Sequence, residues 1–274
     1  RTEGFPVVDR LRANVGAREQ FDQRLATTGR IGCQQHAARV DGEEGLQLGR
    51  RFLALAQHGQ GGRGLRPGVD GVFMRADQHA FAARARFVLL GDYIDRGPAS
   101  NKVLGFLARR PDGVIAIRGN HEEMMFASRE NEQALRYWEV CGGFATLNSY
   151  RYGAKLEEVP QEHWALLSEA RDYYETADVI FTHANYLPDV PMALQPEHQL
   201  RWALLEPAEA HPHASGKTVI VGHTEQHNSE VLDLGFLVCI DTACWRHGWL
   251  TALEVRTRQI WQASRFGMLR DRGE

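Results

Sequence analysis

Short apolar runs that end in polar turns recur along the chain from residue 86 onward. Runs of this length are typical of buried strands, because helices need longer segments with apolar residues at every third or fourth position. The expected strands lie at residues 86–91, 113–118, 178–183, 217–222, 236–241, 248–255 and 258–263. Helical spacing predicts helices at about 99–109, 121–138 and 161–172. Strands that alternate with helices early and follow one another late predict an α/β fold with mixed sheets.

Composition excludes two classes of partner. The 274 residues suffice for one large domain or two small ones, and the net charge is -3 at pH 7. Nucleic acid or an anionic membrane surface would call for a basic excess, so we expect neither partner. The four cysteines show no C-x-x-C pair, and the chain has no long apolar span and no amino-terminal signal pattern. These features predict a cytoplasmic protein with reduced thiols.

Residues 1–85 differ in character from the rest of the chain. They are rich in Arg, Gly and Gln, and they contain only two short apolar runs, at 52–55 and 71–74. The stretch at 57–71 is typical of a loop or linker. We therefore treat 1–85 as an atypical amino-terminal segment and 86–274 as the functional domain. A strand-loop-helix unit would be expected in this part of the chain. Two explanations of its absence are open: the segment is disordered, or it is translated in the wrong frame.

Polar side chains stand at the ends of the first four expected strands. They are Asp92, Asp95 and Arg96 at the first, Asn120 and His121 at the second, His183 at the third and His223 at the fourth. Taken alone, each group is typical of a turn or a helix cap. Sheets built from β-loop-α units bind ligands outside the carboxyl ends of their strands. Four such groups in one chain therefore favour a common site.

A metal site is one use for these residues. One carboxylate, one amide and two imidazoles make a four-ligand set, consisting of Asp92, Asn120, His183 and His223. Mixed nitrogen and oxygen donors suit manganese, iron or zinc better than calcium or magnesium, whose ligands are mostly oxygens. The sequence thus predicts a transition-metal site at the edge of a sheet.

A resemblance to a known family rests on motifs in a fixed order. They are GDYIDRG (91–97), RGNHE (118–122), THAN (182–185), VGHT (221–224) and CIDTACWRHGWLTALEV (239–255). Through them the chain resembles the phosphoprotein phosphatase family of dinuclear metallophosphoesterases, the PPP-type serine/threonine phosphatases, in its bacterial form. The resemblance covers about residues 86–263. It implies a calcineurin-like metallophosphatase fold, in which helices flank two mixed β-sheets.

The resemblance implies two divalent metal ions, with manganese first and iron or zinc as alternatives. Asp92 resembles the carboxylate that bridges both metals, a role that needs two oxygens on one side chain. Asn120, His183 and His223 would complete the coordination of one metal. Paired metals can lower the pKa of a shared water and brace an in-line displacement at phosphorus.

The resemblance also implies roles in binding and proton transfer. His121 resembles the family's general acid, which protonates the leaving oxygen, and Asp95 resembles its orienting partner. Arg96 resembles the phosphate clamp, since a planar guanidinium can bind two phosphoryl oxygens at once. Arg201 is a further candidate for phosphate binding, with a surface role as the alternative.

The chain departs from the family in one motif, Gly-Asp-x-His-Gly, whose aspartate and histidine hold the other metal. Asp77 with His79 has suitable side chains, but it leaves no room for a crossover helix before the next strand. His58 follows an apolar run at a more natural distance, but Ala56 stands where the aspartate is needed. We therefore expect an incomplete second metal site.

The resemblance implies a metal-dependent phosphoesterase that hydrolyses phosphomonoesters by attack of a metal-bound hydroxide. Phosphoserine or phosphothreonine in proteins is the expected substrate. Two alternatives are open: a hydrolase of dinucleoside polyphosphates, and a catalytically impaired pseudophosphatase that binds phosphoprotein. The expected partner is a phosphoprotein or a phosphorylated small molecule.

Overall fold

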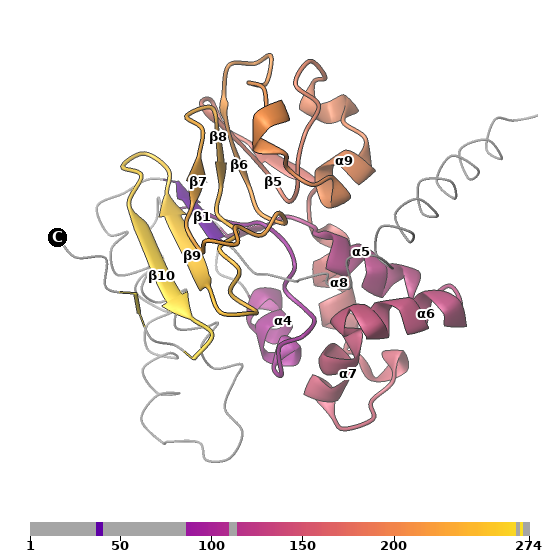
Figure 1. The fold of residues 1–274 in the computed structure, drawn as a ribbon. Helices are drawn as coiled ribbons and strands as arrows, with labels where there is room; N and C mark the ends of the chain where they lie inside the picture. The colour runs from indigo at the N-terminus through magenta and orange to yellow at the C-terminus, as the bar shows by residue number, and fades with distance from the viewer. Residues whose placement is uncertain (1–36, 41–85, 110–113, 267–268, 271–274) are drawn as a thin grey trace, which may run out of the picture. The chain divides into compact units, whose positions relative to one another are not determined.

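The computed structural model describes residues 37–40, 86–109, 114–266 and 269–270, which Figure 1 draws in colour. The chain divides into two units, residues 1–32 and 33–274, and all described residues belong to the second. The strands are β1 (Ala37–Val40), β2 (Arg86–Leu89), β3 (Val114–Ala116), β4 (Tyr173–Glu175), β5 (Val179–Thr182), β6 (Thr218–Val221), β7 (Leu232–Asp233), β8 (Leu237–Cys239), β9 (Trp249–Glu254) and β10 (Ile260–Ser264). The α-helices in these residues are α4 (Ser100–Ala108), α5 (Asn120–Ala127), α6 (Glu132–Trp138), α7 (Phe144–Tyr150), α8 (Gln161–Glu169) and α9 (Glu197–Trp202).

The strands form two five-stranded sheets. The first has the order β10-β9-β1-β2-β3 and the second the order β4-β5-β6-β8-β7. Each sheet combines parallel and antiparallel pairs: β2 with β3 and β5 with β6 are parallel, whereas β1 with β2 and β4 with β5 are antiparallel. The predicted α/β fold with two mixed sheets is confirmed.

A buried apolar layer joins the two sheets. Successive residues of a strand point to opposite faces. Accordingly, Val88 belongs to the layer between the sheets, while Phe87 and Leu89 belong to the outer face of the first sheet. The layer contains residues of both sheets, among them Val88, Leu253, Phe181, Ile220 and Val238. Burial on both faces explains why β2 is a continuous apolar run in the sequence.

Helices cover the outer faces of both sheets. On the first sheet, Leu104 of α4 and Leu167 of α8 share an apolar cluster with Phe87 of β2. On the second sheet, Leu200 of α9 packs with Val219 of β6. Figure 1 labels α4, α8, α9 and β6. This layered arrangement leaves the ends of the strands accessible to loops from both sheets.

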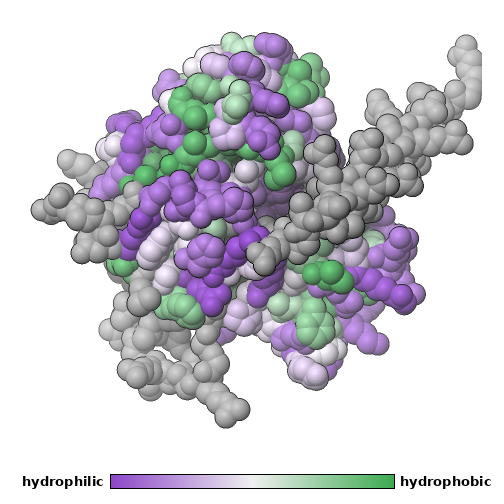
Figure 2. Space-filling model, viewed as in Figure 1, coloured by the Kyte–Doolittle hydropathy of each residue, from purple (hydrophilic) through white to green (hydrophobic). Residues whose placement is uncertain are grey.

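Hydrophilic and hydrophobic residues are interspersed on the face that Figure 2 shows. Within the part of the chain that the structure describes, no helix combines the length and the apolar character needed to cross a membrane. Large hydrophobic side chains that are exposed include Val140, Phe144, Tyr152, Leu194 and Leu204. The surface therefore carries both polar and apolar groups.

All seven predicted strands are present, each inside its predicted range or one residue beyond it. The helices predicted at 99–109 and 161–172 are α4 and α8. The single helix predicted at 121–138 is wrong, because the chain forms α5 and α6 there. The Asn131 side chain accepts a hydrogen bond from the Ala134 amide at 2.9 Å and so begins a new helix.

The sequence pattern did not indicate β1. This strand pairs antiparallel with β2 and parallel with β9, so it lies within the first sheet rather than at its edge. Its four residues belong to the segment 1–85, where no strand was predicted from the sequence. The other residues of that segment lie outside the described part.

His163 of α8 is a buried histidine away from the site described below. Its Nδ1 lies 2.7 Å from the hydroxyl of Tyr150, at the end of α7. Burial lowers the pKa of His163, and Arg109 lowers it further, while Glu162 opposes the change. The folded state therefore favours the neutral imidazole.

This pKa shift predicts a loss of stability in acid. Because the pKa of His163 is lower in the folded chain, the neutral imidazole contributes to the free energy of unfolding. This contribution is full above the ordinary pKa of 6.5 and is lost as the pH falls toward the folded pKa. We expect the free energy of unfolding, measured with denaturant, to fall between about pH 7.5 and about pH 5.5. The fall should be smaller in His163→Gln than in the wild type, because the glutamine side chain stays neutral. Equal losses in the wild type and the variant would contradict the assignment.

Candidate active site

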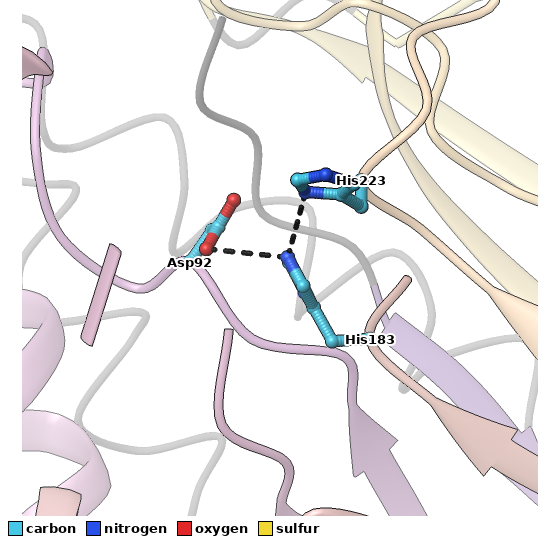
Figure 3. Close-up of side chains that lie close together, drawn as sticks. All are labelled: Asp92, His183 and His223. Atoms are coloured by element: carbon cyan, nitrogen blue, oxygen red, sulfur yellow. Dashed lines mark hydrogen bonds and ion pairs between the residues drawn. The ribbon is translucent and has the colours of Figure 1, made fainter. Parts of the chain in front are cut away.

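The polar groups at the four strand ends come from two pairs of parallel strands. In the first sheet, β2 leads to Asp92 and β3 leads to Asn120. In the second sheet, β5 leads to His183 and β6 leads to His223. Figure 3 shows Asp92, His183 and His223 directed toward one another. The fold thus brings together side chains that are far apart in the sequence.

The backbone is strained at this edge of the sheets. Asp92, Asp95, Arg96 and His223 have φ angles of 57°, 75°, 58° and 62°. They are four of the seven non-glycine residues with positive φ in the described part of the chain. Each such conformation costs about 1 to 3 kcal/mol and persists only where its surroundings hold it, which is common at functional sites. The local strain is therefore concentrated where the candidate ligands lie.

Two glycines allow the loops to approach closely. Gly91 has φ 99°, and a Cβ there would lie 2.6 Å from the Gly119 nitrogen and 2.7 Å from Nδ1 of His183. A Cβ on Gly119 would collide with the carboxylate of Asp92. The glycines at both strand ends are therefore required by the packing of the site.

Glu122 ties the two loops of the first sheet together. One of its carboxylate oxygens accepts hydrogen bonds from the amides of Asp92 and Gly119, both at 2.8 Å, and the other accepts one from the amide of Tyr93 at 2.7 Å. Glu122 is fully buried. Glu122 ends the motif RGNHE and lies in the first turn of α5, where its capping bond to Gly119 is present. Its bonds to the loop that carries Asp92 could not be anticipated from that pattern.

Backbone carbonyls fix the orientation of both imidazoles. Nδ1 of His183 lies 2.6 Å from the Leu90 carbonyl, and Nε2 of His223 lies 3.1 Å from the Trp202 carbonyl. A carbonyl only accepts, so each of these nitrogens carries the hydrogen and donates it. In a neutral imidazole the opposite nitrogen then presents a lone pair. These two nitrogens, Nε2 of His183 and Nδ1 of His223, lie 3.1 Å apart (Figure 3).

Further acceptors surround Nε2 of His183. The amide oxygen of Asn120 is 3.1 Å away, and a carboxylate oxygen of Asp92 is 3.5 Å away. Asp92, His183 and His223 each offer a ligand atom, and these atoms lie within 4.8 Å of one another. Buried lone pairs with no hydrogen among them repel one another unless a cation lies between them. With both imidazoles neutral, this donor set fits a transition metal such as manganese, iron or zinc.

Local electrostatics keep Asp92 and His223 in metal-binding forms. Burial alone would raise the pKa of Asp92, but the imidazoles of His183, His121 and His223 outweigh it and lower that pKa. Burial and the neighbouring His183 lower the pKa of His223 to about 3. Asp92 is therefore ionised and His223 neutral near pH 7, as metal ligands must be.

His121 and Asp95 form a buried pair beside the ligands. Nδ1 of His121 lies 2.5 Å from a carboxylate oxygen of Asp95. Trp138 donates from its indole to the same oxygen at 2.9 Å, and the Thr146 hydroxyl donates to the other oxygen at 2.7 Å. In the described part of the chain, Nε2 of His121 is buried with no hydrogen-bond partner. One ring nitrogen is thus fixed by a carboxylate while the other is available to a ligand.

The neighbours of His121 favour its protonated form. Burial alone would lower the pKa of His121, but Asp92 and the hydrogen-bonded Asp95 outweigh burial and raise the pKa. A raised pKa favours the form of the ring that carries a proton on both nitrogens. The arrangement can therefore donate a proton from Nε2.

Arg96 is held in place without using all of its donors. Its guanidinium carbon lies 4.5 Å from the centre of the Trp245 ring, and its Nε donates to the Cys141 carbonyl at 3.3 Å. Its amide donates to the Gly142 carbonyl at 3.2 Å. Its Nη1 is buried without a hydrogen-bond partner among the described residues. This nitrogen is a candidate donor to an anionic ligand.

Each guanidinium nitrogen of Arg201 has a carboxylate partner among the described residues. Arg201 is only 4% exposed, and its guanidinium contacts Asp172 at 2.6 Å and both Glu123 and Glu197 at 3.2 Å. The Nε atom also donates to Asp172, at 3.2 Å. These contacts make Arg201 the centre of an ion-pair network, and they give no support to the predicted phosphate contact.

The predictions for the second metal cannot be compared with the structure. Asp77, His79 and His58 all lie outside the described residues. The described residues supply one set of candidate ligands, to which Asp92 would contribute in either a mononuclear or a dinuclear site.

The known proteins that this chain is similar to include a tetraphosphatase and a protein phosphatase. Over 113 residues the chain is 29% identical to the symmetrical bis(5'-nucleosyl)-tetraphosphatase of Pseudomonas fluorescens, covering 41% of this chain and 36% of that protein. Over 62 residues it is 42% identical to the serine/threonine-protein phosphatase sitA of Aspergillus fumigatus, covering 21% of this chain and 15% of that protein. The matched region spans less than two thirds of each relative's length.

A solved structure agrees on the fold. The chain is similar to a crystal structure assigned provisionally as a diadenosine tetraphosphatase, with a TM-score of 0.50 and 17% identity, covering 87% of this chain and 95% of that one. The sequence model of the calcineurin-like phosphoesterases, a metal-dependent family, matches residues 70–227, which is more than half of the chain. The match includes every loop of the candidate site. The chain therefore belongs to the calcineurin-like phosphoesterase family.

Proposed function

We propose that this chain hydrolyses phosphoester bonds with a divalent metal ion bound by Asp92, Asn120, His183 and His223. The main observation is the buried group of acceptor atoms around Nε2 of His183, which a cation would stabilise. Family membership supports hydrolase activity. Manganese is our first choice of metal, and iron and zinc are the alternatives.

Each side chain has a separate task in this reaction. When bound, a divalent ion supplies Lewis acidity, which polarises phosphoryl oxygens and acidifies water. His121 donates the proton on Nε2 to the leaving-group oxygen. Asp95 holds the imidazole in orientation and stabilises its charged form. Arg96 binds phosphoryl oxygens through its free Nη1.

We further propose phosphomonoesters as substrates, chiefly phosphoserine and phosphothreonine in proteins. The 42% identity with a serine/threonine phosphatase over 62 residues supports this class. Dinucleoside polyphosphates are the second candidate, because the longer match, over 113 residues, is to a tetraphosphatase. The intact pair of His121 and Asp95 argues against a pseudophosphatase, which would not need a general acid. The partner is thus a phosphoprotein or a phosphorylated small molecule.

Parallel assays test the function and separate the substrates. The full chain is supplied with manganese and given p-nitrophenyl phosphate, a phosphothreonine peptide or diadenosine tetraphosphate, with chelator-treated protein as the control. We expect turnover of the first two substrates that depends on the metal. Faster turnover of the tetraphosphate would replace the proposed substrate class. Saturable binding of the phosphopeptide without turnover of any substrate would indicate a pseudophosphatase.

Arg96→Ala should weaken both substrate binding and turnover. The clamp contacts phosphate in the ground state and in the transition state, and a hydrogen bond to a charged group contributes about 1.5 to 3 kcal/mol. We therefore expect kcat/KM to fall by about 10- to 100-fold, with KM raised. The control is Arg136→Ala, which removes an arginine whose side chain is 71% exposed. Unchanged KM in Arg96→Ala would contradict the assignment.

A further inference from the structure

Residues 200–205, here called the strap, contact the loop that carries His183. The strap begins in the last turn of α9 and continues beyond it. The Leu200 carbonyl accepts a hydrogen bond from the amide of Ala184, the residue after His183, at 2.8 Å. The Leu204 carbonyl accepts another from the Asn185 side chain at 2.9 Å. The strap thus fixes the backbone directly after one candidate ligand.

The same strap contacts the loop that carries His223. The Trp202 carbonyl accepts the hydrogen bond from Nε2 of His223 at 3.1 Å, which sets the direction of that ring. The Leu205 amide donates to the hydroxyl of Thr224, the residue after His223, at 2.8 Å. One segment of six residues is therefore bonded to both histidine loops.

Arg201 anchors the strap to the rest of the site. Its Nη2 lies 2.6 Å from Asp172, and its Nη1 lies 3.2 Å from Glu123. Glu123 belongs to α5, three residues after the candidate ligand Asn120, and it also accepts from the indole of Trp202 at 3.0 Å. Asp172 directly precedes β4, which pairs with the strand that leads to His183. A buried guanidinium thus joins the strap to α5, which begins at the candidate ligand Asn120, and to the segment before β4, the neighbour of the strand that leads to His183.

We infer that Arg201 is a positioning residue that assembles the metal site through the strap. The inference rests on the proposed function, because it assigns Arg201 to the metal ligands rather than to the phosphate. Loss of its ion pairs with Glu123 and Asp172 would detach the strap from α5 and from the segment before β4, and would release the strap carbonyls from their positions. The histidines would then lose their preset orientation, and orientation by outer groups is worth about 10- to 100-fold in metal affinity.

Two variants disrupt the ion pair between Arg201 and Asp172, one at each residue. Arg201→Met keeps much of the aliphatic stem but removes the charge. Asp172→Asn keeps the arginine and weakens its shortest ion pair. The matched control is Glu197→Gln, whose side chain is 72% exposed and lies 3.2 Å from the same guanidinium. Because Glu197 belongs to α9 itself, its ion pair does not join the strap to another element.

The first measurement is equilibrium binding of manganese to the chelator-treated full chain. We expect Arg201→Met and Asp172→Asn to weaken binding by about 10- to 100-fold, and Glu197→Gln to leave it unchanged. Arg201→Lys should restore part of the affinity, since an ammonium can satisfy one carboxylate. Far-UV circular dichroism confirms folding, and Asp172→Asn decides the matter if Arg201→Met does not fold.

The second measurement separates positioning from general stability. With cobalt at saturation, an altered visible absorption spectrum in Arg201→Met is expected, because the ligand geometry changes. Inhibition by inorganic phosphate at saturating manganese should stay the same. Weaker phosphate inhibition with unchanged metal affinity would overturn the inference and return Arg201 to phosphate binding.

The outcomes also separate this inference from the proposed function. A wild-type chain that binds no manganese would contradict the proposed function, and the inference with it. A wild-type chain that binds manganese, with equal affinity in Arg201→Met and Asp172→Asn, would overturn the inference alone.

Discussion

We expect His121→Asn to lower kcat by about 100- to 10,000-fold with little change in KM. The imidazole lies 2.5 Å from Asp95, and its other nitrogen has no hydrogen-bond partner among the described residues, so it can give a proton to the leaving oxygen. Asparagine fills a similar space but cannot give up a proton. Because a general acid acts in the transition state, the loss should fall on turnover rather than on binding.

The leaving group provides a sharper test of this role. p-Nitrophenolate departs readily without a proton, whereas the alkoxide of serine or threonine does not. The loss in His121→Asn should therefore be larger for a phosphothreonine peptide than for p-nitrophenyl phosphate. Metal content equal to that of the wild type is the control. Equal losses on both substrates, or a raised KM with unchanged kcat, would show that His121 is not the general acid.

The second large effect is expected at Asp92. Asp92→Asn should weaken binding of manganese by more than about 100-fold. Substitutions of residues that only orient metal ligands lower the affinity by about 10- to 100-fold, and the loss of a ligand should exceed that. Asp92 is the sole anion among the four candidate ligands. Its φ of 57° is one that asparagine tolerates, so the loop should keep its shape. Turnover should fall with the metal.

Asp189→Asn serves as the matched control, since Asp189 is exposed and lies outside the candidate site. It makes the same chemical change and should leave metal content and turnover as they are. Elemental analysis by plasma mass spectrometry after dialysis measures the bound metal directly. Full metal content in Asp92→Asn would show that the carboxylate is not a ligand.

The strand ends of the site could be predicted because local pattern and global fold agree there. A buried strand forces an apolar run, and a close approach of two loops forces a glycine, as at Gly91 and Gly119. The polar residue that follows is then placed at the carboxyl end of a parallel strand. This is why the sequence indicated Asp92, Asn120 and His183 together.

The supporting residues could not be predicted in the same way. Trp138 and Thr146 hold Asp95, but they lie 43 and 51 residues from it in the sequence. No local pattern links side chains across such distances. The same limit explains Arg201, whose partner Asp172 belongs to another segment 29 residues away. From sequence alone, an arginine on a helix that binds phosphate cannot be distinguished from one that pairs with carboxylates of its own chain.

Short elements were missed for a different reason. The four residues of β1 form a strand because β2 and β9 supply the hydrogen-bond ladders on both sides. Their own composition carries no strong strand pattern, so tertiary context decides. The break between α5 and α6 depends on one capping side chain, that of Asn131, inside an otherwise helical pattern.

The most direct test is a manganese titration of chelator-treated chain that follows bound metal and hydrolysis of p-nitrophenyl phosphate in the same samples. The account predicts no hydrolysis in the metal-free chain, and closer to one tightly held metal per chain than two, because the described residues supply one ligand set. Full activity should need millimolar manganese if the second site is incomplete, and Asp92→Asn should abolish the tight phase. Hydrolysis by the metal-free chain, or an unchanged tight phase in Asp92→Asn, would contradict the account.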